Sequence, residues 1–94
     1  MRINICGIPH EVVECEDVFD AEMHLGMIDY KQAKILINKD ANIEIKSETL
    51  CHEIMHGILV HIGREDLSQD ETLVTALGNA IWQTFNVRYL DGEE

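Results

Sequence analysis

The spacing of the apolar residues changes once along the chain, near residue 40. In the first part apolar and polar residues alternate, as they do in a strand that buries one face. The runs at 3–5 and 12–15 are separated by Gly7 and Pro9, two residues that favour turns. This pattern predicts a two-stranded hairpin.

A second hairpin is predicted further along. The apolar runs 25–30 and 33–37 lie on either side of a polar segment, Asp29-Tyr30-Lys31-Gln32. Between the two hairpins, the acidic segment 16–22 has no clear period and is expected to be a loop. The first forty residues therefore predict a small antiparallel sheet of three to four strands.

From Ser47 onward the apolar period becomes helical. Ser47 is a favourable N-cap residue, and Gly63 is a favourable residue just past a helix C-terminus. We therefore expect a helix of about four turns between them, with 39–46 as a connection. The apolar arc of this helix consists of Leu50, Cys51, Ile54, Ile58 and Ile62.

A second helix is expected to follow directly. The segment Ser68-Gln69-Asp70-Glu71 fits a capping box, in which the first and fourth residues cap the helix start. An apolar stripe then runs to about Asn86, formed by Val74, Leu77, Ile81 and Phe85. The predicted fold class is α+β, with a small N-terminal antiparallel sheet followed by two helices.

Length, composition and charge limit the possible functions. The 94 residues, 46% hydrophobic and 27% charged, fit one domain spanning 1–94. A domain of this size buries only about two-thirds of the surface that its unfolded chain exposes, so a metal ion or a partner often adds stability. The 18 acidic and 7 basic residues give a formal net charge of −11, which would repel a nucleic-acid backbone. We expect no nucleic-acid partner.

The expected compartment is the cytoplasm. The three cysteines, Cys6, Cys15 and Cys51, lack the dense spacing of a secreted disulfide scaffold. The first residues lack the apolar core of a signal peptide, and no segment reaches the ~20 apolar residues of a membrane span. We expect no membrane association.

The candidate chemistry lies in the first predicted helix, at His52-Glu53-Ile54-Met55-His56, an H-E-x-x-H motif. Histidines four residues apart lie one turn above the other on a helix, so both imidazoles can bind one Zn²⁺ ion. Glu53 lies beside them and can act as general base on a water at that ion. The alternative, two solvated histidines, fits poorly because the neighbouring residues are mostly apolar.

A catalytic zinc site needs a third protein ligand. The candidates are Glu71, Asp70, Asp66, His61, Cys51, His10 and His24. His61 turns away from His52 along the helix, and Cys51 suits a small buried core position better. Glu71 is favoured because it shares a helix face with Gly78, which would let the two helix backbones approach closely. The same glutamate can instead close the capping box.

The segments around these residues resemble a known family. Residues 49–58 (Thr-Leu-Cys-His-Glu-Ile-Met-His-Gly-Ile) and 71–83, which begin with the glutamate, are similar to short phage and prophage zincins related to the ImmA/IrrE metallo-endopeptidases. The resemblance implies a minimal gluzincin-like domain with His52, His56 and Glu71 as ligands and Glu53 as base. It also implies that the strand at 35–37 borders the cleft and pairs with an extended peptide.

We therefore expect a zinc metallopeptidase acting on a peptide or protein substrate, and the resemblance suggests a regulatory protein as that substrate. Tyr30, His24 and Tyr89 are the side chains considered for stabilising an oxyanion, although ordinary loop or terminal positions explain them more simply. The alternative function is a catalytically inactive zincin-like module that grips a peptide or partner protein. A fourth protein ligand on the metal would favour that alternative.

Overall fold

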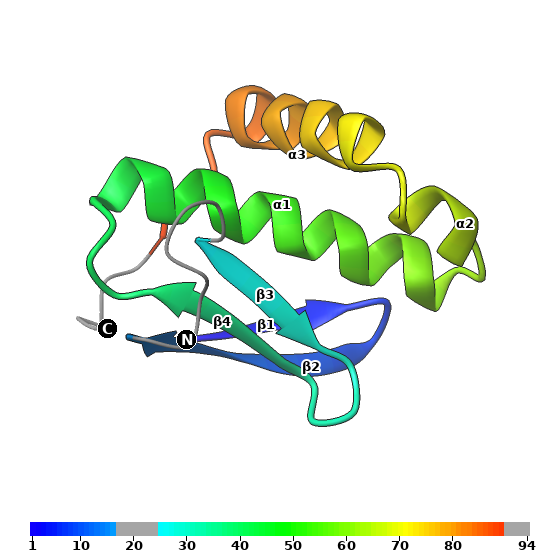
Figure 1. The fold of residues 1–94 in the computed structure, drawn as a ribbon, viewed down its shortest axis with the longest axis horizontal. Coiled ribbons are helices and arrows are strands. Elements are labelled where there is room, and N and C mark those ends of the chain that lie inside the picture. Colours follow the sequence, from blue (N-terminus) through cyan, green and yellow to red (C-terminus); the bar gives the residue numbers. More distant parts are fainter. Residues whose placement is uncertain (17–24, 90–94) are drawn as a thin grey trace.

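The computed structural model describes residues 1–16 and 25–89. Its elements, in chain order, are β1 (Arg2–Ile5), β2 (Ile8–Cys15), β3 (Gly26–Asp29), β4 (Lys34–Asn38), α1 (Ile43–His61), α2 (Glu65–Ser68) and α3 (Glu71–Phe85). The sheet lies on one side of α1 and α3 lies on the other (Figure 1). The predicted α+β class, a sheet followed by helices, is confirmed. Most of the predicted loop at 16–22 falls outside the described residues.

Both predicted hairpins are present. In the first, Ile5 pairs with Ile8, so Cys6 and Gly7 alone form the turn. Both have positive φ, 52° and 86°, which is the requirement of the type I′ turn that joins twisted strands in register. In the second hairpin, Asp29 pairs with Lys34 across a four-residue loop.

The two hairpins join through a parallel pair, so the sheet is mixed rather than antiparallel throughout. The strand order is β1-β2-β4-β3, and β2 runs parallel to β4. Local alternation predicts each hairpin, but it does not specify which strands of two hairpins meet. The central position of β4 explains the outcome, because Ile35 and Ile37 are both 0% exposed and need cover from neighbours on both sides.

Helix α1 begins before Ser47, the N-cap residue expected from the sequence. The observed cap is Asn42, whose Oδ1 accepts a hydrogen bond of 2.8 Å from the Ile45 amide. Ser47 is buried inside the helix instead: its hydroxyl donates to the Ile43 carbonyl (2.9 Å) and accepts from the Tyr89 amide (2.7 Å). The helix therefore starts at the Asn42 cap, and 43–46 are helical rather than a connection.

The expected capping box also differs. Ser68 ends α2, a short helix that the sequence did not predict, and Asp70 caps α3 by accepting from the Leu73 amide at 3.1 Å. Helix α3 ends near Asn86 as predicted, with that residue in the left-handed region at φ 54°. Phe85, placed in the apolar stripe by its spacing, is 72% exposed because the last turn of α3 extends past the core.

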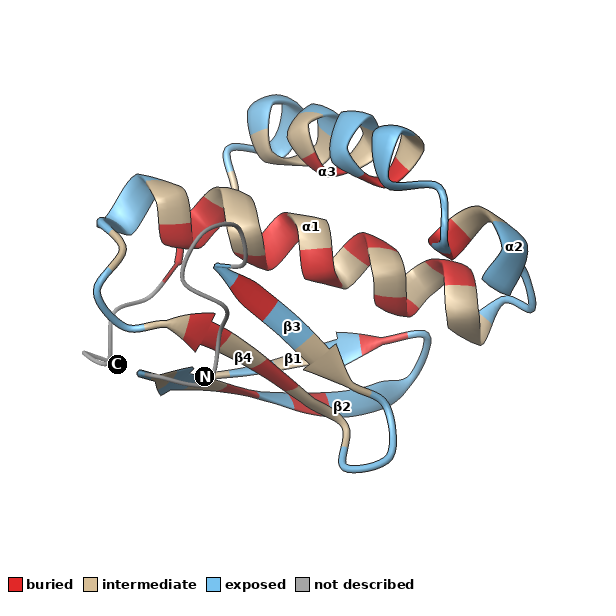
Figure 2. Cartoon of the chain, in the orientation of Figure 1, coloured by how far each residue is buried: buried red, intermediate tan, exposed pale blue. Residues whose placement is uncertain are grey.

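Buried residues lie on both sides of α1 (Figure 2). Toward the sheet, Leu50 of the helix packs in one cluster with Ile35 and Ile37 of β4. Toward α3, Met55 and Leu59 pack on Val74. Cover on two sides is the reason why the second half of this helix is mostly apolar. Among the described residues, no helix combines the length and the apolar composition needed to cross a bilayer.

The C-terminal tyrosine is part of the core, which corrects its expected place near a frayed end. Tyr89 is 6% exposed in the sheet-side cluster, and its hydroxyl donates to Glu14 at 3.1 Å. Lys46 pairs with the same carboxylate at 3.0 Å. Tyr89 is therefore engaged in the core and is not a candidate for oxyanion stabilisation.

Candidate metal and catalytic site

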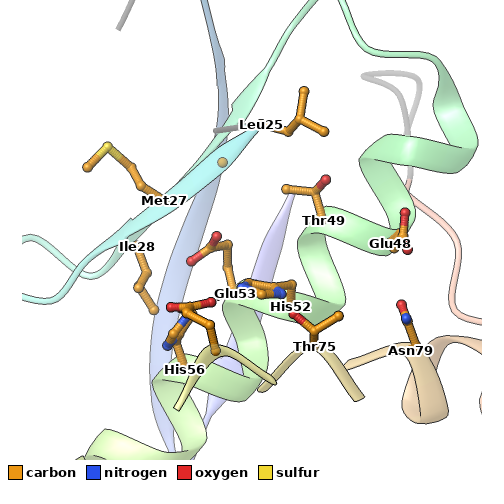
Figure 3. Close-up of a pocket in the computed structure, with 12 residues that line it drawn as sticks. Leu25, Met27, Ile28, Glu48, Thr49, His52, Glu53, His56, Thr75 and Asn79 are labelled. Atoms are coloured by element: carbon orange, nitrogen blue, oxygen red, sulfur yellow. Dashed lines mark hydrogen bonds and ion pairs between the residues drawn. The ribbon is translucent and has the colours of Figure 1, made fainter. Parts of the chain in front are cut away.

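The H-E-x-x-H residues line a pocket of about 650 Å³ between α1, α3 and the edge of the sheet. His52, Glu53 and His56 come from α1, as the motif predicts, and Glu71 comes from the first turn of α3. In Figure 3 the two imidazoles and the Glu53 carboxylate lie together in the pocket, with Met27 and Ile28 of β3 on one side.

The three predicted metal ligands lie close together. Their ligand atoms lie within 4.8 Å of one another. Oε1 of Glu71 is 3.1 Å from Nε2 of His52, and Oε2 is 3.2 Å from Nε2 of His56. Ligand atoms at ordinary zinc distances around a tetrahedron are about 3.3 Å apart, so the two contacts have a suitable length. The prediction that the Glu71 carboxylate lies toward α1 is confirmed, and its role as a ligand stays a prediction.

A glycine allows this approach of the two helices. A Cβ added at Gly78 would lie 3.1 Å from Cα and 3.2 Å from the backbone nitrogen of His52. Both are backbone atoms of α1 and cannot move aside as a flexible side chain would. The predicted close backbone contact at Gly78 is confirmed, and it brings the start of α3 within reach of the histidines.

Most other candidates for the third ligand are engaged elsewhere. Asp66 pairs with Arg64 at 2.9 Å, and Asp70 caps α3. His61 stacks edge-on against His10 with ring centroids 5.6 Å apart. Cys51 is fully buried in the core, as expected for a small thiol, and His24 lies outside the described residues.

Sequence reasoning missed one residue at this site. Oγ of Ser68 lies 2.9 Å from Nδ1 of His56, on the opposite side of the ring from Glu71. Ser68 is 6% exposed at the end of α2. No known motif places a hydrogen-bonding partner twelve residues after the second histidine. The only sequence pattern that included Ser68 was the expected capping box.

Burial changes the acid–base properties of the site. Glu53 is 7% exposed, and burial, together with the charge of Glu71, raises its pKa to about 7. Burial lowers the pKa of His56, and the charge of Glu71 partly offsets that effect. A carboxyl group with a pKa near neutrality can both accept and return a proton, the property required of a general base that later acts as an acid.

The raised pKa of Glu53 predicts a pH-dependent stability of the metal-free protein. The unfolded chain binds this proton only below about pH 4.5, whereas the folded chain holds it up to about pH 7. The stability contributed by the proton is therefore present at low pH and lost as the pH rises through 7, a change of roughly 2–3 kcal/mol. Relative to wild type, Glu53→Gln should be about equally stable at pH 5 and more stable by that amount at pH 8.

Urea unfolding of both proteins with a chelator present measures this difference. The lowered pKa of His56 acts in the opposite direction, because its stability is lost as the pH falls, but that residue is present in both proteins and cancels. A difference in unfolding free energy that is equal at pH 5 and pH 8 would contradict the prediction.

The strand beside the pocket is β3, not the 35–37 strand that the resemblance implied. β4 contains 35–37 and is paired on both sides, with β2 and β3. Within the described residues, β3 has a strand partner on one side only. A Cβ at Gly26 would lie 2.6 Å from Cγ2 of Thr49, so the absence of a side chain there lets β3 run close to α1.

Comparisons of the chain with protein-family models, with curated proteins and with solved structures give no match. The interpretation of the pocket therefore rests on its own geometry and chemistry.

Proposed function

We propose that this protein is a zinc-dependent metallopeptidase. The observation that carries the proposal is the convergence of two helical histidines and Glu71, from a different helix, beside the buried carboxyl group of Glu53. The first three are ligands suited to zinc, and Glu53 has the place and the acidity of a general base. Glu71 comes from a different helix than the H-E-x-x-H residues, so its meeting with them in one pocket supports a functional role.

The donor set fits a divalent cation. Both oxygens of the Glu71 carboxylate face imidazole nitrogens, and burial keeps His56 largely neutral at pH 7. A cation among the three groups would balance the carboxylate charge and use the lone pairs of the nitrogens. Two nitrogens and one oxygen are also the ligands of many catalytic zinc sites.

The number of ligands favours catalysis over a structural metal. Structural zinc sites usually have four protein ligands, whereas catalytic sites keep one position open. In the part of the chain that the structure describes, the cluster contains three candidate ligands and no fourth histidine, cysteine or carboxylate. This count supports the enzyme over the inactive binding module.

The metal ion and Glu53 would have different roles in hydrolysis. Bound zinc supplies a Lewis acid that polarises a carbonyl group and lowers the pKa of a water. Glu53 accepts the proton of the attacking water and returns it to the leaving amine. Its burial keeps competing solvent away from the carboxyl group.

The surroundings of the site suggest a neutral or basic peptide in extended form. Edge strand β3 can pair with such a peptide through its backbone. Exposed Leu25 and Met27 offer apolar contacts along the pocket, and the carboxylate of Glu48 lines it as well. The net charge of −11 disfavours an acidic substrate. A regulatory protein is the substrate suggested by the family resemblance, and the free cysteines suit the cytoplasm.

The test is zinc-dependent cleavage of unfolded proteins. Zinc-loaded protein, incubated with a denatured basic protein, is expected to produce new peptide termini that mass spectrometry detects, and chelated protein is expected to produce none. A denatured acidic protein should be cleaved more slowly because of the charge of the enzyme. One zinc per chain without cleavage of either substrate would contradict the enzyme and favour the binding module.

A further inference from the structure

We propose that Ser68 is a positioning residue for His56. Its hydroxyl holds the imidazole so that Nε2 faces Glu71, and it accepts a hydrogen bond from Nδ1–H when Nε2 binds a metal ion. The inference deepens the proposed function and rests on its zinc site. It concerns a residue outside the ligand set and outside the general base.

The imidazole of His56 has a partner at each ring nitrogen. Nδ1 lies 2.9 Å from Oγ of Ser68, and Nε2 lies 3.2 Å from Oε2 of Glu71. The side chain of His56 is 14% exposed and Ser68 is 6% exposed, so water competes little for these contacts. Turning the ring over would break both contacts at once, which favours one orientation.

A serine suits this place because a hydroxyl can both donate and accept. In the metal-free protein, Nε2–H can donate to Glu71 while the serine hydroxyl donates to Nδ1. When a metal ion takes Nε2, the ring proton must lie on Nδ1, and the hydroxyl rotates to accept it.

The position of Ser68 depends on α2. This four-residue helix lies between α1 and α3, and its first residues, Glu65 and Asp66, are exposed. Ser68 is its buried residue, and its amide bonds back to the Arg64 carbonyl at 3.2 Å. Helix α2 thus places the Ser68 hydroxyl against the imidazole of His56. Partners of this kind fix the orientation of metal-binding histidines, and their loss usually weakens metal binding about 10–100-fold.

The experiment compares four variants with the wild-type chain. Ser68→Ala removes the hydroxyl, Ser68→Cys keeps its approximate size with only weak hydrogen bonding, and Ser68→Thr keeps the hydroxyl. Ser47→Ala removes a hydroxyl that is equally buried but lies at the far end of α1. Zinc affinity is measured by competition with a chelating dye. NMR follows exchange of the imidazole N–H protons in the zinc-loaded proteins and ring orientation in the metal-free proteins.

For Ser68→Ala and Ser68→Cys we expect about 10-fold weaker zinc binding, rapid solvent exchange of the His56 Nδ1–H and two ring orientations without metal. Ser68→Thr and Ser47→Ala should resemble wild type. A zinc affinity and a protected Nδ1–H that are unchanged in Ser68→Ala and Ser68→Cys would overturn the proposal while leaving the proposed function intact. A wild-type chain that binds no zinc would overturn both the peptidase and the metal-bound state of this contact. Ring order that depends on a hydroxyl at residue 68 would then support only the positioning of the metal-free imidazole.

Discussion

Replacing Glu53 by glutamine is expected to slow peptide hydrolysis by the zinc-loaded protein by about 10²–10⁴-fold, the usual contribution of a general base. Glutamine has nearly the same shape as glutamate but cannot accept a proton from water at neutral pH. Because Glu53 lies beside the predicted ligands rather than among them, the variant should still bind one zinc ion.

The measurement is the rate of cleavage of one peptide by zinc-loaded wild type and variant, with zinc content determined on the same samples. Glu44→Gln is the matched control, since it makes the same change at an exposed position in the first turn of the same helix. It should cleave at the wild-type rate. Equal rates for Glu53→Gln and wild type at equal zinc content would remove Glu53 from the proposed mechanism.

Removing zinc is expected to lower the melting temperature by about 15–30 °C. Free zinc at a thousandfold excess over its dissociation constant stabilises a protein by about 4 kcal/mol, and each kcal/mol corresponds to about 4–8 °C in a domain of this size. The ion would connect α1 to α3, in addition to the packing of Met55 and Leu59 on Val74 and the close backbone contact at Gly78. In a domain this small, an ion that bridges two helices is a large part of the total stability.

Calorimetry with zinc and with a chelator measures the shift. Glu71→Gln should reduce it strongly, because the variant loses the only predicted ligand on α3. Glu65→Gln, an exposed glutamate on α2, should keep the full shift. Identical melting curves with and without chelator in the wild type would contradict the coupling of metal binding to stability.

Much of the candidate site was predictable because it depends on short distances along the chain. His52, Glu53 and His56 share one helix, and helical periodicity alone places them together. The approach of Glu71 was also predictable, since Gly78 marks a close contact between the two helices. The first hairpin was predictable from local alternation, but its turn was not. The sequence placed the second strand at 12–15, after Gly7 and Pro9, whereas β2 begins at Ile8 and includes Pro9.

Other features depend on contacts between segments that are distant in the chain. Ser68 contacts His56 through a short helix that has no periodic pattern, and its capping-box signal pointed to a different role. The buried contact of Ser47 likewise depends on Tyr89, whose amide bonds to its hydroxyl across 42 positions. Neither contact has a spacing that a sequence pattern could recognise.

The sequence by itself determined the two hairpins, the two longer helices and the pairing of the two histidines with Glu53, because each follows from the backbone geometry of neighbouring residues. Only the tertiary structure decided that β2 and β4 run parallel, that β3 rather than β4 borders the pocket, and that Glu53 has a pKa of about 7. These properties arise from which surfaces pack together and how much water they exclude, and residues far apart in the chain set both.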